Sequence, residues 1–130
     1  MSVVTTGRGR PLGSGLMYPA GSVRDAELAA LFAACKQNVA GACTSVSPDA
    51  IAAIIPAGRH VASTKVDGEQ WFLCKDSDAA FLASPNGRVI TGVPIADEAE
   101  RILSGWSGVL AGELYATVDT GRPRVFEAYA

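Results

Sequence analysis

The sequence predicts an α+β domain with a largely antiparallel sheet. Helix-like segments come first, and segments in which apolar and polar residues alternate dominate the second half of the chain. Asp67-Gly68 and Asn86-Gly87 each separate two alternating segments, and such dipeptides supply the positive backbone φ that tight hairpin turns need. Helices followed by hairpin-linked strands are typical of the α+β class.

The N-terminal part of the chain predicts an arm and two helices. Residues 1–22 are rich in Gly, Pro, Ser and Thr without any period, so we expect a flexible N-terminal arm. Residues 25–37 are rich in alanine and place their larger apolar side chains on one helical face. Residues 47–55 predict a short second helix, with Ser47 as its N-cap and proline at the first helical position.

The rest of the chain predicts a sheet interrupted by one helix. Strands are expected over 60–66, 70–76, 79–84, 88–93, 108–116 and 122–130, with a helix over 97–106. The last of these strands runs directly into Ala130, and its backbone groups still need hydrogen-bond partners. We therefore expect residues 23–130 to form part of a larger domain, or to be completed by a second chain that pairs with the C-terminal strand.

Composition limits the classes of function. The 130 residues are 48% apolar and 18% charged, which describes one globular domain. A net charge of −2 argues against strong autonomous binding to nucleic acid. Three cysteines without a C-x-x-C pair argue against a disulfide framework or a zinc site. Without a membrane-length apolar run or a secretory signal pattern, the expected location is cytoplasmic, with no membrane partner.

Three short motifs carry a resemblance to a known family. Lys65-Val66-Asp67-Gly68 matches the K-x-D-G signature of covalent nucleotidyltransferases. Ser84-Pro85-Asn86-Gly87-Arg88 resembles the ligase segment S-R-N-G, and Gly112-Glu113-Leu114-Tyr115 is similar to the strand D-G-E-L. The final segment, RVFEAYA, resembles an aromatic strand of the same family. From about residue 59 to 130 the chain thus resembles the first half of the adenylation domain of an ATP-dependent DNA ligase.

The resemblance implies ATP and Mg²⁺ as cofactors and Lys65 as the catalytic nucleophile. The lysine amine of this family attacks the α-phosphorus of ATP and forms a lysyl-AMP intermediate, which passes AMP to nicked DNA or RNA. A lysine is normally protonated at neutral pH, so such a site must lower its pKa or place metal ions beside it. By the same resemblance, Glu113 would contact the ribose or, indirectly, a metal. The nucleotide-binding residues implied are Thr64, Asp67, Gly68, Gln70, Arg88, Glu113 and Phe126, with Tyr129 as an alternative to Phe126.

Several positions depart from the family pattern, and alternatives remain open. Gln70 and Pro85 stand where the family has arginine, and Ala111 stands where it has an acid. Lys65 is either the nucleophile or a solvated residue of a hairpin turn. The chain is therefore either part of a ligase, expected to be inactive or nearly so by itself, or a non-catalytic nucleotide-binding or subunit-interaction module. The choices between DNA and RNA and between ATP and GTP are also open.

Overall fold

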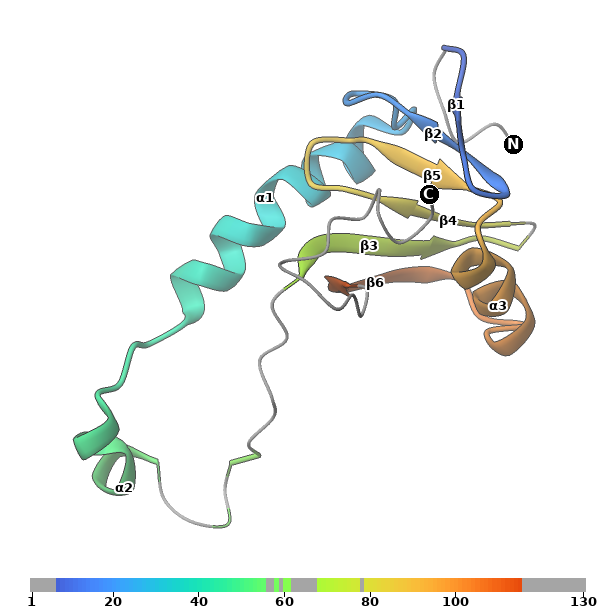
Figure 1. Cartoon of the computed structure of the whole chain (residues 1–130). Helices are drawn as coiled ribbons and strands as arrows, with labels where there is room; N and C mark the ends of the chain where they lie inside the picture. The colour runs from blue at the N-terminus through green and yellow to red at the C-terminus, as the bar shows by residue number, and fades with distance from the viewer. Residues whose placement is uncertain (1–6, 56–57, 59, 62–67, 78, 116–130) are drawn as a thin grey trace.

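The computed structural model describes residues 7–55, 58, 60–61, 68–77 and 79–115. Its centre is a six-stranded sheet with the strand order β1-β2-β5-β4-β3-β6, in which every pair of neighbours is antiparallel (Figure 1). The strands are β1 (Arg10–Leu12), β2 (Gly15–Tyr18), β3 (Glu69–Lys75), β4 (Ala80–Ala83), β5 (Val89–Thr91) and β6 (Gly108–Leu114). The predicted α+β class with an antiparallel sheet is confirmed.

The helices differ in how closely they follow the prediction. Helix α1 (Ala26–Ala42) matches the predicted first helix and continues beyond it. The second predicted helix divides into a 3-10 turn (Pro48–Ala50) and the short α2 (Ile51–Ile54). Helix α3 (Pro94–Ile102) begins earlier than predicted, because its proline occupies the first turn, where no backbone N–H is required. None of the described helices is long and apolar enough to cross a membrane.

The prediction of a flexible arm over residues 1–22 is wrong in part, because β1 and β2 lie within this segment and belong to the sheet. β1 and β2 form a hairpin in which Arg10 is opposite Met17, and Gly13, with φ +56°, lies in the turn. β2 in turn pairs with β5, with Leu16 opposite Thr91. Both strands are very short and interrupted by glycine and proline, so they show no alternation in the sequence. They form because β5 offers an edge whose backbone groups need partners.

The hairpin predicted around Asn86-Gly87 is confirmed with one difference. The Ser84 carbonyl accepts a hydrogen bond from the Gly87 N–H at 2.9 Å, and the Arg88 carbonyl accepts one from the Ser84 N–H at 3.0 Å. Only Gly87 adopts positive φ, at +77°, whereas Asn86 does not. The turn is therefore longer than the two-residue connection that the dipeptide suggested.

The strand predicted over 60–66, which the Asp67-Gly68 turn would join to β3, lies mostly outside the described residues. β3 pairs with β6 along its whole length and with β4 over Phe72–Lys75. His60 and Val61 are not in a strand, and residues 62–67 lie outside the described residues, as does the strand predicted over 122–130.

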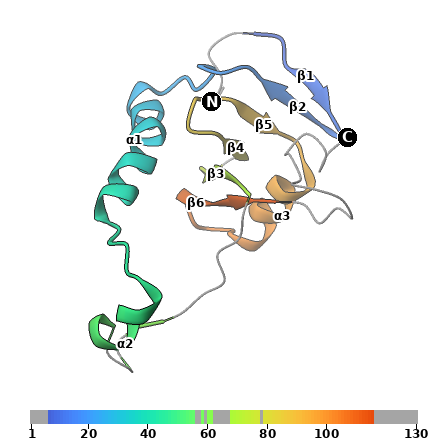
Figure 2. The same ribbon diagram turned by 60° about the vertical axis from the view of Figure 1, so that its left-hand side comes forward.

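The sheet buries a separate core on each face. α1 and α3 lie on opposite sides of the sheet (Figure 2), and the second half of α1 extends away from it together with α2. On the α3 side, Trp71, Leu82, Ile90 and Val93 are fully buried. On the α1 side lies a second buried cluster: Val23, Phe32, Phe72, Cys74, Phe81, Ala83 and Val89. Successive strand residues alternate between these two cores.

Candidate functional site

The strand register brings the three motif segments to the same end of the sheet. Phe72 of β3 is opposite Ala83 of β4 and opposite Ala111 of β6. The Ser84–Arg88 turn begins directly after Ala83, and Glu113 follows two residues after Ala111. The start of β3, the end of β4 and the end of β6 are therefore neighbours, and the described parts of all three motifs are located there.

Gly68, the last residue of the K-x-D-G motif, is packed against the Gly-Glu-Leu-Tyr segment. A Cβ atom added to Gly68 would lie 2.5 Å from the carbonyl oxygen of Leu114. That distance is shorter than any tolerable contact, so the close approach of these two segments requires a residue without a side chain. The first and third motifs are thus in direct contact.

Gln70 and Glu113 are directly opposite each other and share the α1 face of the sheet. The Gln70 amide Nε2 donates to the Sγ of Cys35 on α1, at 3.7 Å. The Glu113 side chain is exposed, so its carboxylate is accessible to a ligand. This end of the α1 face therefore combines an amide, a thiol and an accessible carboxylate.

The opposite face at the same end carries a small cavity of about 130 Å³ that Trp71, Gly112 and Leu114 help to line. Trp71 is buried, with 3% of its surface exposed, and its indole N–H donates to Oε2 of Glu69 at 3.3 Å. Phe72, the next residue, is equally buried on the other face. Both aromatic side chains therefore belong to the cores, and neither is exposed for stacking on a base.

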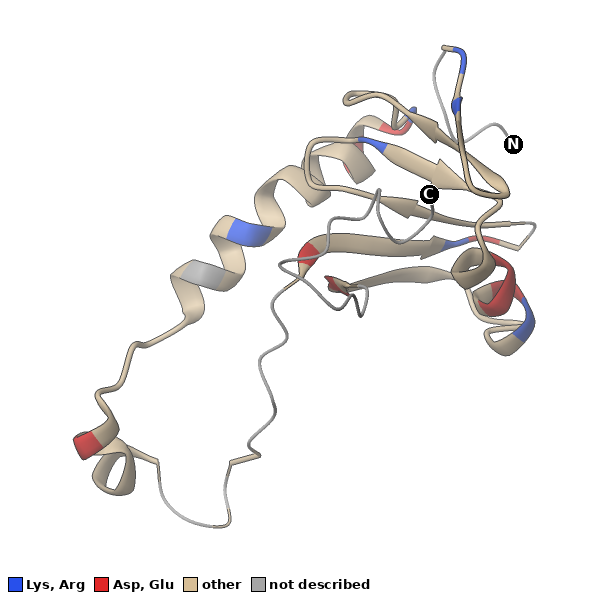
Figure 3. Cartoon of the chain, viewed as in Figure 1, with Lys and Arg blue, Asp and Glu red and all other residues tan. Residues whose placement is uncertain are grey.

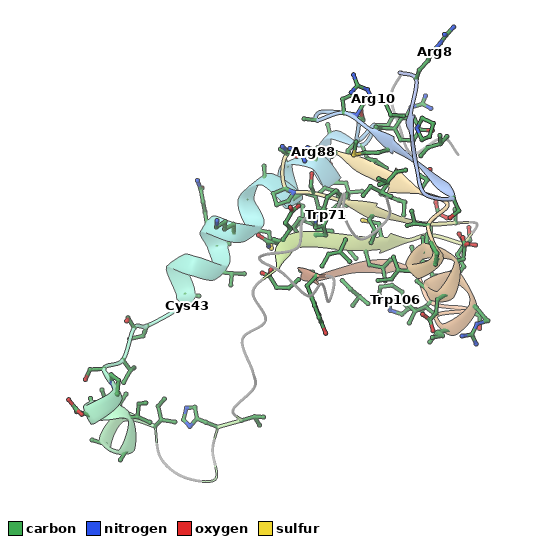
Figure 4. The ribbon with its side chains drawn as sticks, in the orientation of Figure 1. Arg8, Arg10, Cys43, Trp71, Arg88 and Trp106 are labelled. Atoms are coloured by element: carbon green, nitrogen blue, oxygen red, sulfur yellow. The ribbon has the colours of Figure 1, made fainter. Side chains whose placement is uncertain are left out.

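The Ser84–Arg88 turn is held by its own side chains. The Ser84 hydroxyl donates to Oδ1 of Asn86 at 2.6 Å and accepts from the Arg88 N–H at 3.0 Å. Arg88 is half-buried at the turn between β4 and β5. Figure 4 labels both Arg88 and Trp71, which is part of β3. The rigid turn fixes the backbone from which the guanidinium extends.

The remaining predicted site residues cannot be located from the structure. Lys65, Thr64, Asp67 and Phe126 lie outside the described residues, as does Tyr129. Of the sequence-predicted residues, the structure brings together Gly68, Gln70 and Glu113, and locates the Arg88 turn at the same end of the sheet. Within the described part of the chain, no three acidic, histidine or cysteine side chains form a group able to hold a metal ion.

A cavity that the sequence did not predict lies at the other end of β3. It has a volume of about 460 Å³ and is bordered by the start of α1, the end of β3 and the start of β6. Its position separates it from Gln70 and Glu113, because Gln70 precedes the cavity residue Cys74 by four positions along β3, or roughly 13 Å. Residues from three distant segments form its walls, so no local sequence pattern could indicate it.

No known protein family, curated protein or solved structure matches the chain.

Proposed function

We propose that the chain is part of the adenylation domain of an ATP-dependent polynucleotide ligase, with Lys65 as the nucleophile. The observation that carries this proposal is the meeting of the three motif segments at one end of the sheet. Gly68 contacts Leu114, Gln70 is opposite Glu113, and the Ser84–Arg88 turn begins beside them. Segments that share a site must meet in space, and these do so although more than forty positions separate the first from the third.

Chain connectivity keeps Lys65 close to this group of residues. Lys65 stands three residues before Gly68, so its Cα lies within about 11 Å of the Gly68 Cα, whatever the conformation between them. In the proposed reaction its neutral amine attacks the α-phosphorus of ATP. The N–P bond forms, the bond from the α-phosphorus to the bridging oxygen breaks, and pyrophosphate leaves. The amine gives up a proton to solvent or to a nearby base.

Glu113 and Gln70 have distinct roles in this proposal. The accessible carboxylate of Glu113 accepts hydrogen bonds from the ribose hydroxyls of the nucleotide. The same carboxylate suits Mg²⁺, which is commonly held by one or two carboxylates together with waters and substrate phosphates. The Gln70 amide connects the site to α1 through its hydrogen bond to Cys35. Bound Mg²⁺ would neutralise charge on the triphosphate and favour departure of pyrophosphate.

A second function, reversible nucleotide binding without catalysis, is favoured by one specific contact. Gln70 stands where the family has arginine, and its amide is directed to Cys35. The site therefore lacks a cation at a position where an anion contact would assist the transfer of AMP. A site of this kind retains ribose recognition through Glu113 and loses part of its stabilisation of the reacting phosphate.

The test combines covalent labelling with binding. The chain is incubated with Mg²⁺ and ATP carrying a radioactive α-phosphate, and the adduct is mapped by mass spectrometry. We expect slow formation of an AMP adduct on Lys65, absent from Lys65→Ala and retained by Lys36→Ala, a lysine substitution on the exposed face of α1. An adduct that persists in Lys65→Ala contradicts the assignment of the nucleophile.

Binding separates the two functions. We expect Glu113→Ala to weaken ATP binding about tenfold, the effect of losing one charge-assisted hydrogen bond. Glu98→Ala is the matched control, because Glu98 lies on α3 and is ion-paired only to Arg101 in the described structure, at 3.6 Å. Saturable binding without an adduct supports the non-catalytic function. Absence of both binding and adduct contradicts both proposals.

A further inference from the structure

The cavity at the Lys75 end of β3 has apolar walls contributed by separate elements. Val23 precedes α1 and Leu28 lies in its first turn, whereas Cys74 and Phe81 come from β3 and β4 and Val109 from β6. Cys74, Phe81 and Val23 are buried, whereas Leu28 and Val109 are half-buried and border the opening. The floor of the cavity is therefore continuous with the core on the α1 face.

The rim of the cavity carries two cationic and two anionic residues, and three of the four are hydrogen-bonded to the protein backbone. Arg24 and Lys75 are cationic, and Asp25 and Asp76 are anionic. Asp25 accepts hydrogen bonds from the N–H groups of Glu27 and Leu28 at the start of α1, at 2.9 and 3.0 Å. Asp76 accepts from the Ala79 N–H at 2.9 Å, and the Lys75 ammonium donates to the Asp76 carbonyl at 3.0 Å. Charges of both signs also lie near the start of α1 in Figure 3, so the rim does not select a charged ligand.

The Cys74 thiol adds no charge to the floor. Desolvation by burial raises its pKa from an ordinary value of 9.0 to about 12. The sulfur therefore stays protonated at neutral pH and behaves as a small apolar group. Its one hydrogen bond in the described structure, to the Phe72 carbonyl at 4.0 Å, is directed back into the strand.

We propose that this cavity binds an uncharged, largely apolar small molecule. Its volume of about 460 Å³ falls within the range of about 300–1,000 Å³ that is usual for small-molecule sites. Such sites combine mainly apolar walls with a few polar groups at the opening, as found here. Because the cavity and Glu113 lie at opposite ends of the sheet, this site is separate from the proposed nucleotide site and does not depend on it.

The test uses Nile red, a neutral apolar dye whose fluorescence increases in apolar surroundings, titrated with the full chain. Val109→Phe adds a ring to the cavity wall, and we expect it to weaken dye binding by at least about tenfold. Leu110→Phe is the matched control, because Leu110 is the next residue of β6 and faces the other side of the sheet. It should leave the dye affinity within about twofold.

A second cavity variant and a second dye test whether the loss of dye binding comes from filling the cavity. Leu28→Phe fills the cavity from α1 and should reproduce the effect of Val109→Phe, while thermal unfolding shows whether each variant is folded. Anilinonaphthalene sulfonate, an anionic dye of similar apolar character, should bind more weakly than Nile red. Non-saturable dye binding, equal affinity in folded Val109→Phe, or clear preference for the anionic dye would each overturn the proposal.

Discussion

Replacement of Phe32 by alanine should detach α1 from the sheet. Among the described side chains of α1, Phe32 alone is buried, with 0% of its surface exposed. Its ring stacks on Phe72 of β3, with ring centroids 4.5 Å apart and planes inclined by 19°. The rest of the helix is exposed or half-buried, and its second half extends beyond the sheet (Figure 1). Phe32 is thus the main attachment of a 17-residue helix, with the half-buried Leu28, Ala29 and Cys35 packed against the same core.

The expected loss of stability follows from this pair. Phe→Ala substitutions in packed cores cost about 3–5 kcal/mol, through lost burial and the cavity left behind. Stacked aromatic pairs contribute about 0.5–1.5 kcal/mol beyond burial. Domains of this size are stable by about 5–15 kcal/mol, so the substitution removes a large share of the total. Leu31→Ala, at the neighbouring position with 53% of its side chain exposed, should change stability by no more than about 0.5 kcal/mol.

Urea unfolding, followed by circular dichroism, measures both effects. A double-mutant cycle with Phe72→Ala isolates the coupling between the two rings, which we expect at about 0.5–1.5 kcal/mol. If Phe32→Ala shifts the free energy of unfolding no more than Leu31→Ala does, α1 is not held through Phe32. The same result would remove the physical basis for the Cys35–Gln70 contact, because Cys35 lies one helical turn further along α1.

Three further predictions concern the backbone and the buried thiol. Gly68→Ala should lower stability by about 1–3 kcal/mol in urea unfolding, because its methyl group would meet the Leu114 carbonyl, while Gly112→Ala, with open space around it, should cost less than about 0.5 kcal/mol. Equal effects of the two would contradict the close approach. Gly87→Ala, at φ +77°, should lower the unfolding free energy by about 1–2 kcal/mol; an unchanged melting temperature would argue against the turn described. The Cys74 pKa is raised to about 12, so between about pH 9 and 12 the folded chain retains a proton that the unfolded chain loses. Stability should therefore fall as pH rises through this window, and Cys74→Ala should flatten the decline; identical pH profiles would count against the buried thiol.

Local patterns predicted the elements that are long or strongly periodic. β3 alternates between two cores and was predicted from that alternation, as was the β4–β5 hairpin from Asn86-Gly87. β1 and β2 were missed because three and four residues interrupted by proline and glycine are too short to show a period. The pairing of β3 with β6 was not predicted, for a different reason. A turn dipeptide reports only local geometry, whereas β3 takes its neighbours from β4 and the distant β6.

Sequence analysis indicated individual residues of the candidate site, but not how they are arranged in space. The motifs indicated candidate residues, but not that Gln70 is opposite Glu113, because register between distant strands depends on the packing of the whole sheet. Cys35 falls within the first predicted helix, over residues 25–37, and nothing local indicated that it would contact Gln70. The cavity beside Cys74 likewise lies between residues near the start of α1, the end of β3 and the start of β6, which no single segment brings together.

The directions of the strands determine how strongly the meeting of the three motif segments supports a shared site. A K-x-D-G tetrapeptide before a strand is a weak signal by itself, since turns with lysine are common. However, β3 leads away from that motif, while its neighbours β4 and β6 run antiparallel to it and lead toward it. The other two motifs occur at the ends of β4 and β6, and not at their starts. Had Glu113 stood at the start of seven-residue β6, it would lie roughly 20 Å away, at the end where Lys75 is found. The β3–β4 hairpin by itself places the end of β4 beside the start of β3, so it is the position of Glu113 near the end of the distant β6 that supports a shared nucleotide site.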